Sequence, residues 1–231
     1  MGGQAEPDQQ QLRRAFTQEL EQLKIQIEVM ALRVDEALSS STRVLLTGDL
    51  ELARKVVAGD DEIDAMFVSL TERCYGLLGL QNPMASDLRL VVSVLRILGD
   101  LERTGDLCLR IVKLAPDHHL LAANHETFVR LEDMAEEAMD LYRTAIKAWS
   151  TQDLRLAQTL EARDDAMDSH YSRLLATILD IEGPNAVPVA ITTLLAGRAL
   201  ERIADHSVTI GERLRYMLTG NLESISKEIG P

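Results

Sequence analysis

Aromatic side chains are scarce in this sequence, at 3% of its 231 residues, with three Phe and one Trp. A protein that binds bases or sugars by stacking needs aromatic rings on its surface, so such a platform is not expected here. Basic residues are the minority, because 24 Lys and Arg stand against 37 Asp and Glu and give a net charge of −13. A chain of this charge repels phosphate backbones and anionic lipid headgroups, which argues against nucleic-acid binding.

Several other features are missing. The two cysteines, Cys74 and Cys108, form no CxxC motif, and we expect them to be partly buried free thiols in a reducing compartment. No apolar run is long enough to span a bilayer and Met1–Gln10 is polar, so we expect a cytoplasmic protein without direct membrane insertion. The chain has no Gly-rich phosphate loop, no GxSxG and no HExxH, so the sequence does not predict an enzyme.

Apolar residues instead recur at three- and four-residue intervals, the pattern of amphipathic helices. Gly, Pro and Asp punctuate this pattern and predict six long helices, at about 12–46, 50–79, 87–114, 123–149, 154–181 and 188–218. Asp49 is the expected N-cap of the second helix and Ser86-Asp87 that of the third. Long helices joined by short turns pack antiparallel. The predicted fold is therefore all-α, with two tandem antiparallel three-helix bundles at 12–116 and 120–218 and flexible tails at 1–11 and 219–231.

The two bundles are copies of one unit. When Asp49–Asp64 is set against Asp153–Asp168, an offset of 104 residues, eight of sixteen positions are identical. The last helix of each unit aligns at an offset of 99, which matches Leu101-Glu102-Arg103 to Leu200-Glu201-Arg202 and Asp106 to Asp205. Self-similarity over this length is the signature of an internal structural repeat.

Both copies carry pairs of carboxylates four residues apart. These pairs are Glu102 with Asp106 and Glu201 with Asp205 on the last helices, and Asp60 with Asp64 and Asp164 with Asp168 on the middle helices. On a helix this spacing places both side chains on one face, where like charges cost about 0.2–0.5 kcal/mol. Because the middle and last helices run antiparallel, the pairs of one repeat could surround one volume. Oxygen-only sites of this kind suit hard or intermediate cations.

Two interpretations of these carboxylates stay open from the residues alone. Arg103, Arg198 and Arg202 lie three residues before Asp106, Glu201 and Asp205, so the charges could belong to a salt-bridge lattice. Repetition of both pairs at matching places in both halves favours a bound divalent metal, with iron, manganese, magnesium and calcium as candidates. His206 follows Asp205 directly, about 100° around the helix, so it need not belong to the site.

The same motifs resemble those of the PhoU family of bacterial phosphate-signalling proteins. The resemblance covers about residues 12–218 and rests on two E(D)xxxD motifs, Glu102-Arg-Thr-Gly-Asp106 and Glu201-Arg-Ile-Ala-Asp205. It extends to Gln81–Arg89 before the third helix and to the segment from Asp60 to Asp64. One departure is Leu107, which occupies the position that His206 has in the second repeat.

The resemblance implies a negative regulator of the phosphate-starvation response. Such proteins are thought to link the ATPase subunit of a phosphate ABC transporter to a membrane sensor histidine kinase, and many form homodimers. The family also implies, in some members, multinuclear clusters of iron or another metal, such as zinc, on the E(D)xxxD faces. We carry the ligand role first onto Glu102, Asp106, Glu201 and Asp205, and then onto Asp60, Asp64, Asp164 and Asp168.

Two other functions remain alternatives at this point. The first is a metal-dependent enzyme or a metal-storage bundle that uses the same carboxylate faces. The second is a purely structural bundle. The sequence offers no basic cluster or Gly-rich turn that would hold phosphate itself. We therefore expect the protein to relay a phosphate signal and not to sense the ion directly.

Overall fold

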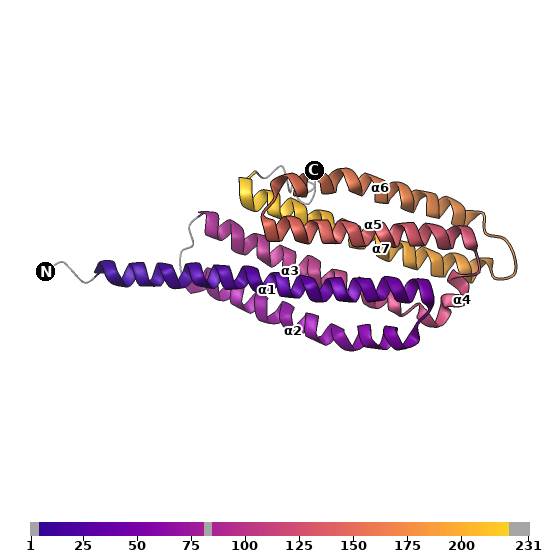
Figure 1. Ribbon diagram of the computed structural model, residues 1–231, viewed down its shortest axis with the longest axis horizontal. Coiled ribbons are helices and arrows are strands. Elements are labelled where there is room, and N and C mark those ends of the chain that lie inside the picture. The colour runs from indigo at the N-terminus through magenta and orange to yellow at the C-terminus, as the bar shows by residue number, and fades with distance from the viewer. Residues whose placement is uncertain (1–4, 81–84, 222–231) are drawn as a thin grey trace.

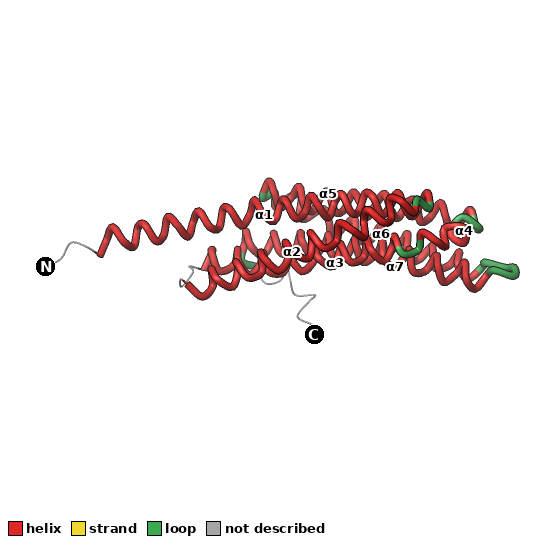
Figure 2. Tube along the Cα trace, turned by 90° about the horizontal axis from the view of Figure 1, so that it is seen from below, coloured by secondary structure: helices red, strands yellow, loops and turns green. Residues whose placement is uncertain are grey.

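The computed structural model describes residues 5–80 and 85–221 and forms an elongated bundle of helices (Figure 1). The first repeat contains α1 (Ala5–Thr47), α2 (Leu50–Leu80) and α3 (Ala85–Val112), and the second contains α5 (His125–Thr151), α6 (Leu154–Leu179) and α7 (Ala186–Thr219). A short 3₁₀ turn, η1 (Ala115–Asp117), and the one-turn helix α4 (His118–Leu121) connect them. Within the described residues there is no strand (Figure 2). The predicted all-α fold with six long helices is confirmed.

The first helix begins earlier than the sequence predicted. Residues 1–11 were expected to be a flexible tail, yet α1 starts at Ala5 and its first turns project beyond the rest of the bundle (Figures 1 and 2). Pro7 lies in the first turn, where a missing N–H breaks no helical hydrogen bond, and Gln9–Gln11 are good helix formers. Residues 1–4, the turn at Gln81–Pro83 and residues 222–231 of the expected C-terminal tail lie outside the described residues.

The joint between the first two helices of each repeat has the same construction in both copies. Asp49 caps α2 by accepting the N–H groups of Glu51 and Leu52 at 3.0 and 2.9 Å. Asp153 caps α6 in the same way. The residue before each cap is left-handed, with φ of 69° at Gly48 and 50° at Gln152. Only glycine adopts this conformation without steric cost, so the second joint is the more strained of the two.

The start of α3 also differs from the prediction. The helix begins at Ala85, so Ser86 and Asp87 lie in its first turn and the expected N-cap at these residues is wrong. Their short polar side chains suit a helix N-terminus, and Asp87 there interacts favourably with the helix dipole. The sequence signal therefore marked the correct turn but not its first residue.

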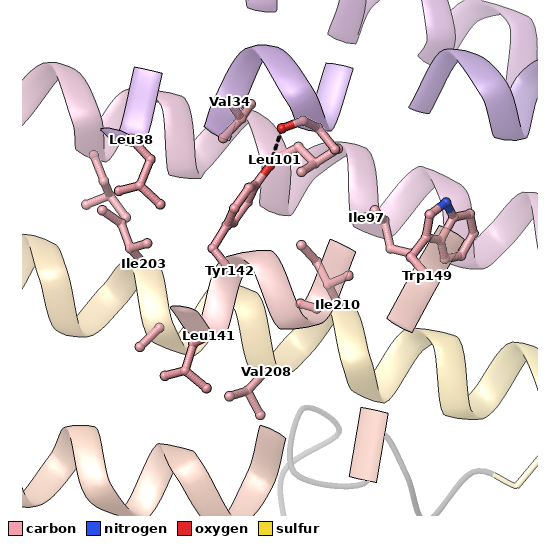
Figure 3. Packing of buried hydrophobic residues seen from close by; sticks show 14 of the residues in the cluster. Val34, Leu38, Ile97, Leu101, Leu141, Tyr142, Trp149, Ile203, Val208 and Ile210 are labelled. Atoms are coloured by element: carbon pink, nitrogen blue, oxygen red, sulfur yellow. Dashed lines mark hydrogen bonds between the residues drawn. The ribbon is translucent and has the colours of Figure 1, made fainter. Parts of the chain in front are cut away.

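One hydrophobic core joins both repeats. It contains buried side chains from all six long helices, among them Leu38 of α1, Leu101 of α3, Leu141 of α5 and Ile203 of α7 (Figure 3). The hydroxyl of the buried Tyr142 donates to the carbonyl oxygen of Ala31 at 2.8 Å and so ties α5 to α1. The two predicted bundles therefore pack side by side on a shared core.

The centre of this arrangement is the antiparallel pair α3 and α7. His206 of α7 contacts Asp100 of α3, and nearer the other end Arg89 of α3 donates to the carbonyl of Met217. The residue numbers in contact rise along one helix as they fall along the other, so a pseudo-two-fold axis relates the repeats.

Both cysteines are buried free thiols, and burial raises the pKa of each to about 12. None of the described helices is long and apolar enough to cross a membrane.

Candidate functional site

The first group of predicted site residues comes together between α2 and α3. We call Asp60, Asp64, Glu102 and Asp106 the first acidic site. Ile63, buried in the core, turns this stretch of α2 toward α3. Opposite it, α3 has Gly105, where an added Cβ would lie 3.5 Å from Ile63 and 3.7 Å from the Asp60 carboxylate oxygen Oδ1. The helices therefore approach each other closely at the position that brings the two pairs together.

The charges of the first acidic site act on one another across the helix interface. Burial raises the pKa of Asp60, and the negative charges of Asp64 and Asp106 raise it further. Burial likewise raises the pKa of Glu102, followed by the charges of Asp106 and Asp64. Carboxylates repel one another in this way when they face a common volume. The four carboxylates of the first repeat are therefore close enough for their charges to interact, and their arrangement around one shared volume stays a prediction.

The equivalent group in the second repeat lies between α6 and α7. We call Asp164, Asp168, Glu201 and Asp205 the second acidic site. Burial is the main cause of the raised pKa of Glu201, and the charges of Asp205 and Asp168 add to it. Burial also raises the pKa of Asp205. Asp164 is half-buried on α6, one turn before Asp168.

Glu201 is the most buried of these carboxylates, at 8% exposed. Its Oε1 accepts a hydrogen bond from Arg198, whereas its Oε2 is buried without a hydrogen-bond partner. A buried carboxylate oxygen that is left unpaired carries a desolvation cost of about 1–3 kcal/mol or more. A cation bound at the second acidic site would remove that cost.

The predicted salt-bridge lattice is only partly present. Arg198 does pair with Glu201, as the three-residue spacing predicted. The Nη1 atom of Arg103 instead lies 4.0 Å from Oδ1 of Asp100, which is three residues before it, whereas Asp106 is three residues after it. Within the described part of the chain, no Lys or Arg forms a salt bridge with any of the four carboxylates of the first acidic site. The arginines thus neutralise part of the second site and little of the first.

His206 contacts a residue outside the second acidic site. Its Nδ1 lies 3.1 Å from Oδ1 of the buried Asp100 across the α3–α7 interface. The pseudo-two-fold axis relates this pair to Leu107 and Ala199, both of which are buried apolar residues. The departure noted at Leu107 therefore accompanies a second difference, because the positions equivalent to His206 and Asp100 are both buried and apolar. Sequence reasoning identified His206 but missed Asp100, which has no repeat counterpart to mark it.

Metal binding is chemically reasonable at both sites but is not preformed. Among residues 5–80 and 85–221, no three His, Cys, Asp or Glu side chains are arranged as a ready ligand set. Four members are exposed: Asp64, Asp106, Asp168 and Asp205. The donors fit hard cations, because all are carboxylate oxygens and one of them, Oε2 of Glu201, lacks a partner. The ligand role of the eight carboxylates stays a prediction.

Comparison with known proteins places the chain in a family. The PhoU domain model matches residues 27–115 and 131–214, one match in each repeat. The phosphate-specific transport system accessory protein PhoU homolog 1 of Mycobacterium tuberculosis is 34% identical over 91% of this chain and 96% of its own length. The PhoU protein of Edwardsiella tarda is 28% identical over 89% and 85%.

Solved structures agree with the sequence relatives. PhoU from Pseudomonas aeruginosa superposes with a TM-score of 0.84 at 28% identity, covering 89% of this chain and 100% of that one. The phosphate transport system regulatory protein PhoU from Streptococcus pneumoniae gives a TM-score of 0.78, also at 28% identity, over 90% and 98%. The two repeats, the paired E(D)xxxD motifs and these matches lead to one conclusion: the chain belongs to the PhoU family.

Proposed function

We propose that this protein is a regulatory accessory protein of phosphate transport. The observation that carries the proposal is the match, over nearly the whole chain, to relatives named as phosphate-specific transport system accessory proteins. The fold supports a role in binding, since long antiparallel helices expose broad surfaces on which partner proteins can dock. We infer that the protein acts in the cytoplasm, by association and not by catalysis, and that it forms a homodimer.

In its specific form, the proposal is a negative regulator of the phosphate-starvation response. The protein would connect the ATPase subunit of a phosphate ABC transporter to a sensor histidine kinase and relay the phosphate supply to the kinase. A tagged form should co-purify with the ATPase subunit and with the kinase from cells grown in ample phosphate. Failure to recover either protein, at high and at low phosphate, would contradict the adaptor role.

We further propose that the two acidic sites bind a hard cation. The support is the mutual repulsion of the carboxylates and the buried unpaired Oε2 of Glu201. Residues Glu102 and Glu201 would hold the ion from the last helices, assisted by the exposed aspartates around them. The bound cation would supply positive charge that offsets the repulsion and could offer a bridging contact to an acidic partner.

Elemental analysis of protein purified without chelators tests this second proposal. The wild type should carry stoichiometric metal, and Glu102→Gln and Glu201→Gln should each lose part of it. Asp165→Asn, an exposed residue of α6 outside the site, is the matched control and should retain the metal. Metal-free wild-type protein whose thermal stability does not rise with added Mg²⁺, Mn²⁺ or Fe²⁺ would favour the salt-bridge interpretation. Stoichiometric metal together with conversion of a substrate by the metal-loaded protein would support the enzyme alternative.

A further inference from the structure

An apolar groove of about 580 Å³ lies at the end of the first repeat, between the start of α2 and the end of α3. Leu50 and Val57 form one wall and are 46% and 49% exposed. They are seven residues apart, so the wall is about two helical turns long. Pro116 of η1 stands in the opposite wall, and the buried Ala53 contributes to the floor.

The floor of the groove is separate from the main core. Ala53 and Val112 belong to a small cluster of buried residues that does not join the core shared by the six helices. Small clusters of this kind under a connection are common. Here, however, the apolar surface continues outward to the half-exposed Leu50 and Val57. Apolar residues that line an open groove are typical of surfaces that receive a partner.

The second repeat closes the equivalent place. Val57 corresponds to Glu161 and Pro116 to Arg215, which form a salt bridge of 3.3 Å between α6 and α7. Beneath it, Gly211 lets the Leu160 side chain pack directly against the α7 backbone. This closure is possible because α7 continues to Thr219, whereas the first repeat leaves the helix at Val112. The groove therefore is not a general result of the fold but belongs to the first repeat.

Two cations border the groove in an otherwise acidic protein. Arg54 stands on α2 and Lys113 at the end of α3, and both are exposed. Within the described residues neither forms a salt bridge, although Lys113 does oppose the charge of the nearby Asp60. The counterparts in the second repeat are Gln158 and Glu212, so the positive charge is also confined to the first repeat.

We propose that this groove docks an amphipathic helix of a protein partner, with two or three apolar side chains flanked by Asp or Glu. The apolar walls suit the helix-in-groove mode of recognition, in which side chains one and two turns apart enter a trough. The cations on both walls are complementary to acidic flanks and would orient the helix. A small ligand is a poorer fit, because such ligands are mostly enclosed by their sites and this groove is open. The inference rests on the proposed adaptor function and specifies one docking surface for it.

The test measures binding of the purified full-length protein to two probes, the transporter ATPase subunit and the sensor kinase in nanodiscs. Val57→Glu introduces the residue that the second repeat has at this position, and Arg54→Glu/Lys113→Glu reverses the border charges. Each should raise the Kd for the partner that uses the groove by about tenfold or more. Val68→Glu is the matched control, since Val68 is also on α2 and is 54% exposed, and it should leave the Kd unchanged. The effect of the charge reversal should shrink as the salt concentration rises.

Each other outcome has a distinct meaning. If a partner binds the wild type and all variants equally, the adaptor function stands and the groove proposal is overturned. If neither protein binds the wild type, the adaptor proposal fails and the groove proposal fails with it. A change of oligomeric state in Val57→Glu would assign the groove to a second copy of this chain. Binding to anionic lipid vesicles that Val57→Glu abolishes would assign it to a membrane surface. Either result would overturn the proposed occupant.

Discussion

The hydrogen bond between Tyr142 and Ala31 makes a quantitative test of how the two repeats are joined. Tyr142→Phe removes only the hydroxyl and leaves the ring, which is fully buried in the shared core, in place (Figure 3). The lost bond is 2.8 Å long and connects α5 to α1. The variant therefore weakens the contact between repeats without opening a large cavity.

The expected cost follows from what each group keeps. The Ala31 carbonyl lies within α1 and still accepts the helical N–H of Asp35, so it is not left without a partner. The change then costs about 1 kcal/mol, the net contribution of one buried hydrogen bond, within a range of about 0.5–1.5 kcal/mol. For a protein of this size, a loss of about 1 kcal/mol corresponds to a fall of about 2–4 °C in Tm.

Urea denaturation followed by circular dichroism measures this free energy. The midpoint should fall while the slope m stays constant, because the surface exposed on unfolding does not change. Tyr75→Phe is the matched control, since Tyr75 is 62% exposed, and it should change nothing. An unaltered midpoint in Tyr142→Phe would refute the view that this bond stabilises the junction. A second transition would refute the shared core, because separate bundles would then unfold independently.

Three further predictions follow from particular residues. Gln152→Gly should stabilise the protein by about 0.5–1 kcal/mol, since it relieves a left-handed φ of 50°, whereas Gly48→Ala should destabilise it because the added methyl would lie 2.8 Å from His118. Gly76→Ala should stabilise the protein by about 0.5–1 kcal/mol, because a Cβ at this position meets no other atom. Gly197→Ala should destabilise it by about 1–3 kcal/mol, because its Cβ would overlap the Leu174 side chain. Thermal denaturation measures the stability of all four variants. At the carboxyl groups with raised pKa, the folded protein binds protons more tightly than the unfolded chain does. The protein therefore loses stability as the pH rises above the ordinary pKa of these groups, which is about 4. The groups with raised pKa are Asp60, Glu102, Glu201 and Asp205. Variants with Asn or Gln at two of these positions should become more stable relative to the wild type as the pH rises, as measured by urea titration. A stability difference that does not change with pH would contradict the raised pKa values.

Much of the fold could be predicted from local sequence signals. Helix ends are set by residues with strong backbone preferences, so the predicted cap at Asp49 gave the start of α2 correctly. The start of α1 is harder to predict, because Pro7 lies among polar residues typical of a tail and yet is well accommodated in a first helical turn. Periodicity located the helices, and the internal repeat then supplied their pairing.

Local sequence signals predict some features of the candidate site but not the contacts between residues that are distant in the sequence. The four-residue spacing of carboxylates predicts a shared helix face, and the repeat predicts that the faces occur twice, so the sequence predicts which carboxylates of α2 and α3 influence one another's charge. The contact between Asp100 and His206 does not, because it joins residues 106 apart and has an apolar counterpart in Leu107 and Ala199. The groove at Val57 had a usable signal, since comparison of the repeats shows an apolar residue where the other copy has Glu161.

We propose that this protein restrains the phosphate-starvation response. The most direct measurement is a phosphate-starvation reporter in a deletion strain grown with ample phosphate and complemented with the wild-type chain. We expect the reporter to be active in the deletion strain and to be silenced by the wild type. A reporter that stays silent in a strain without this gene and without any homologous gene would contradict it.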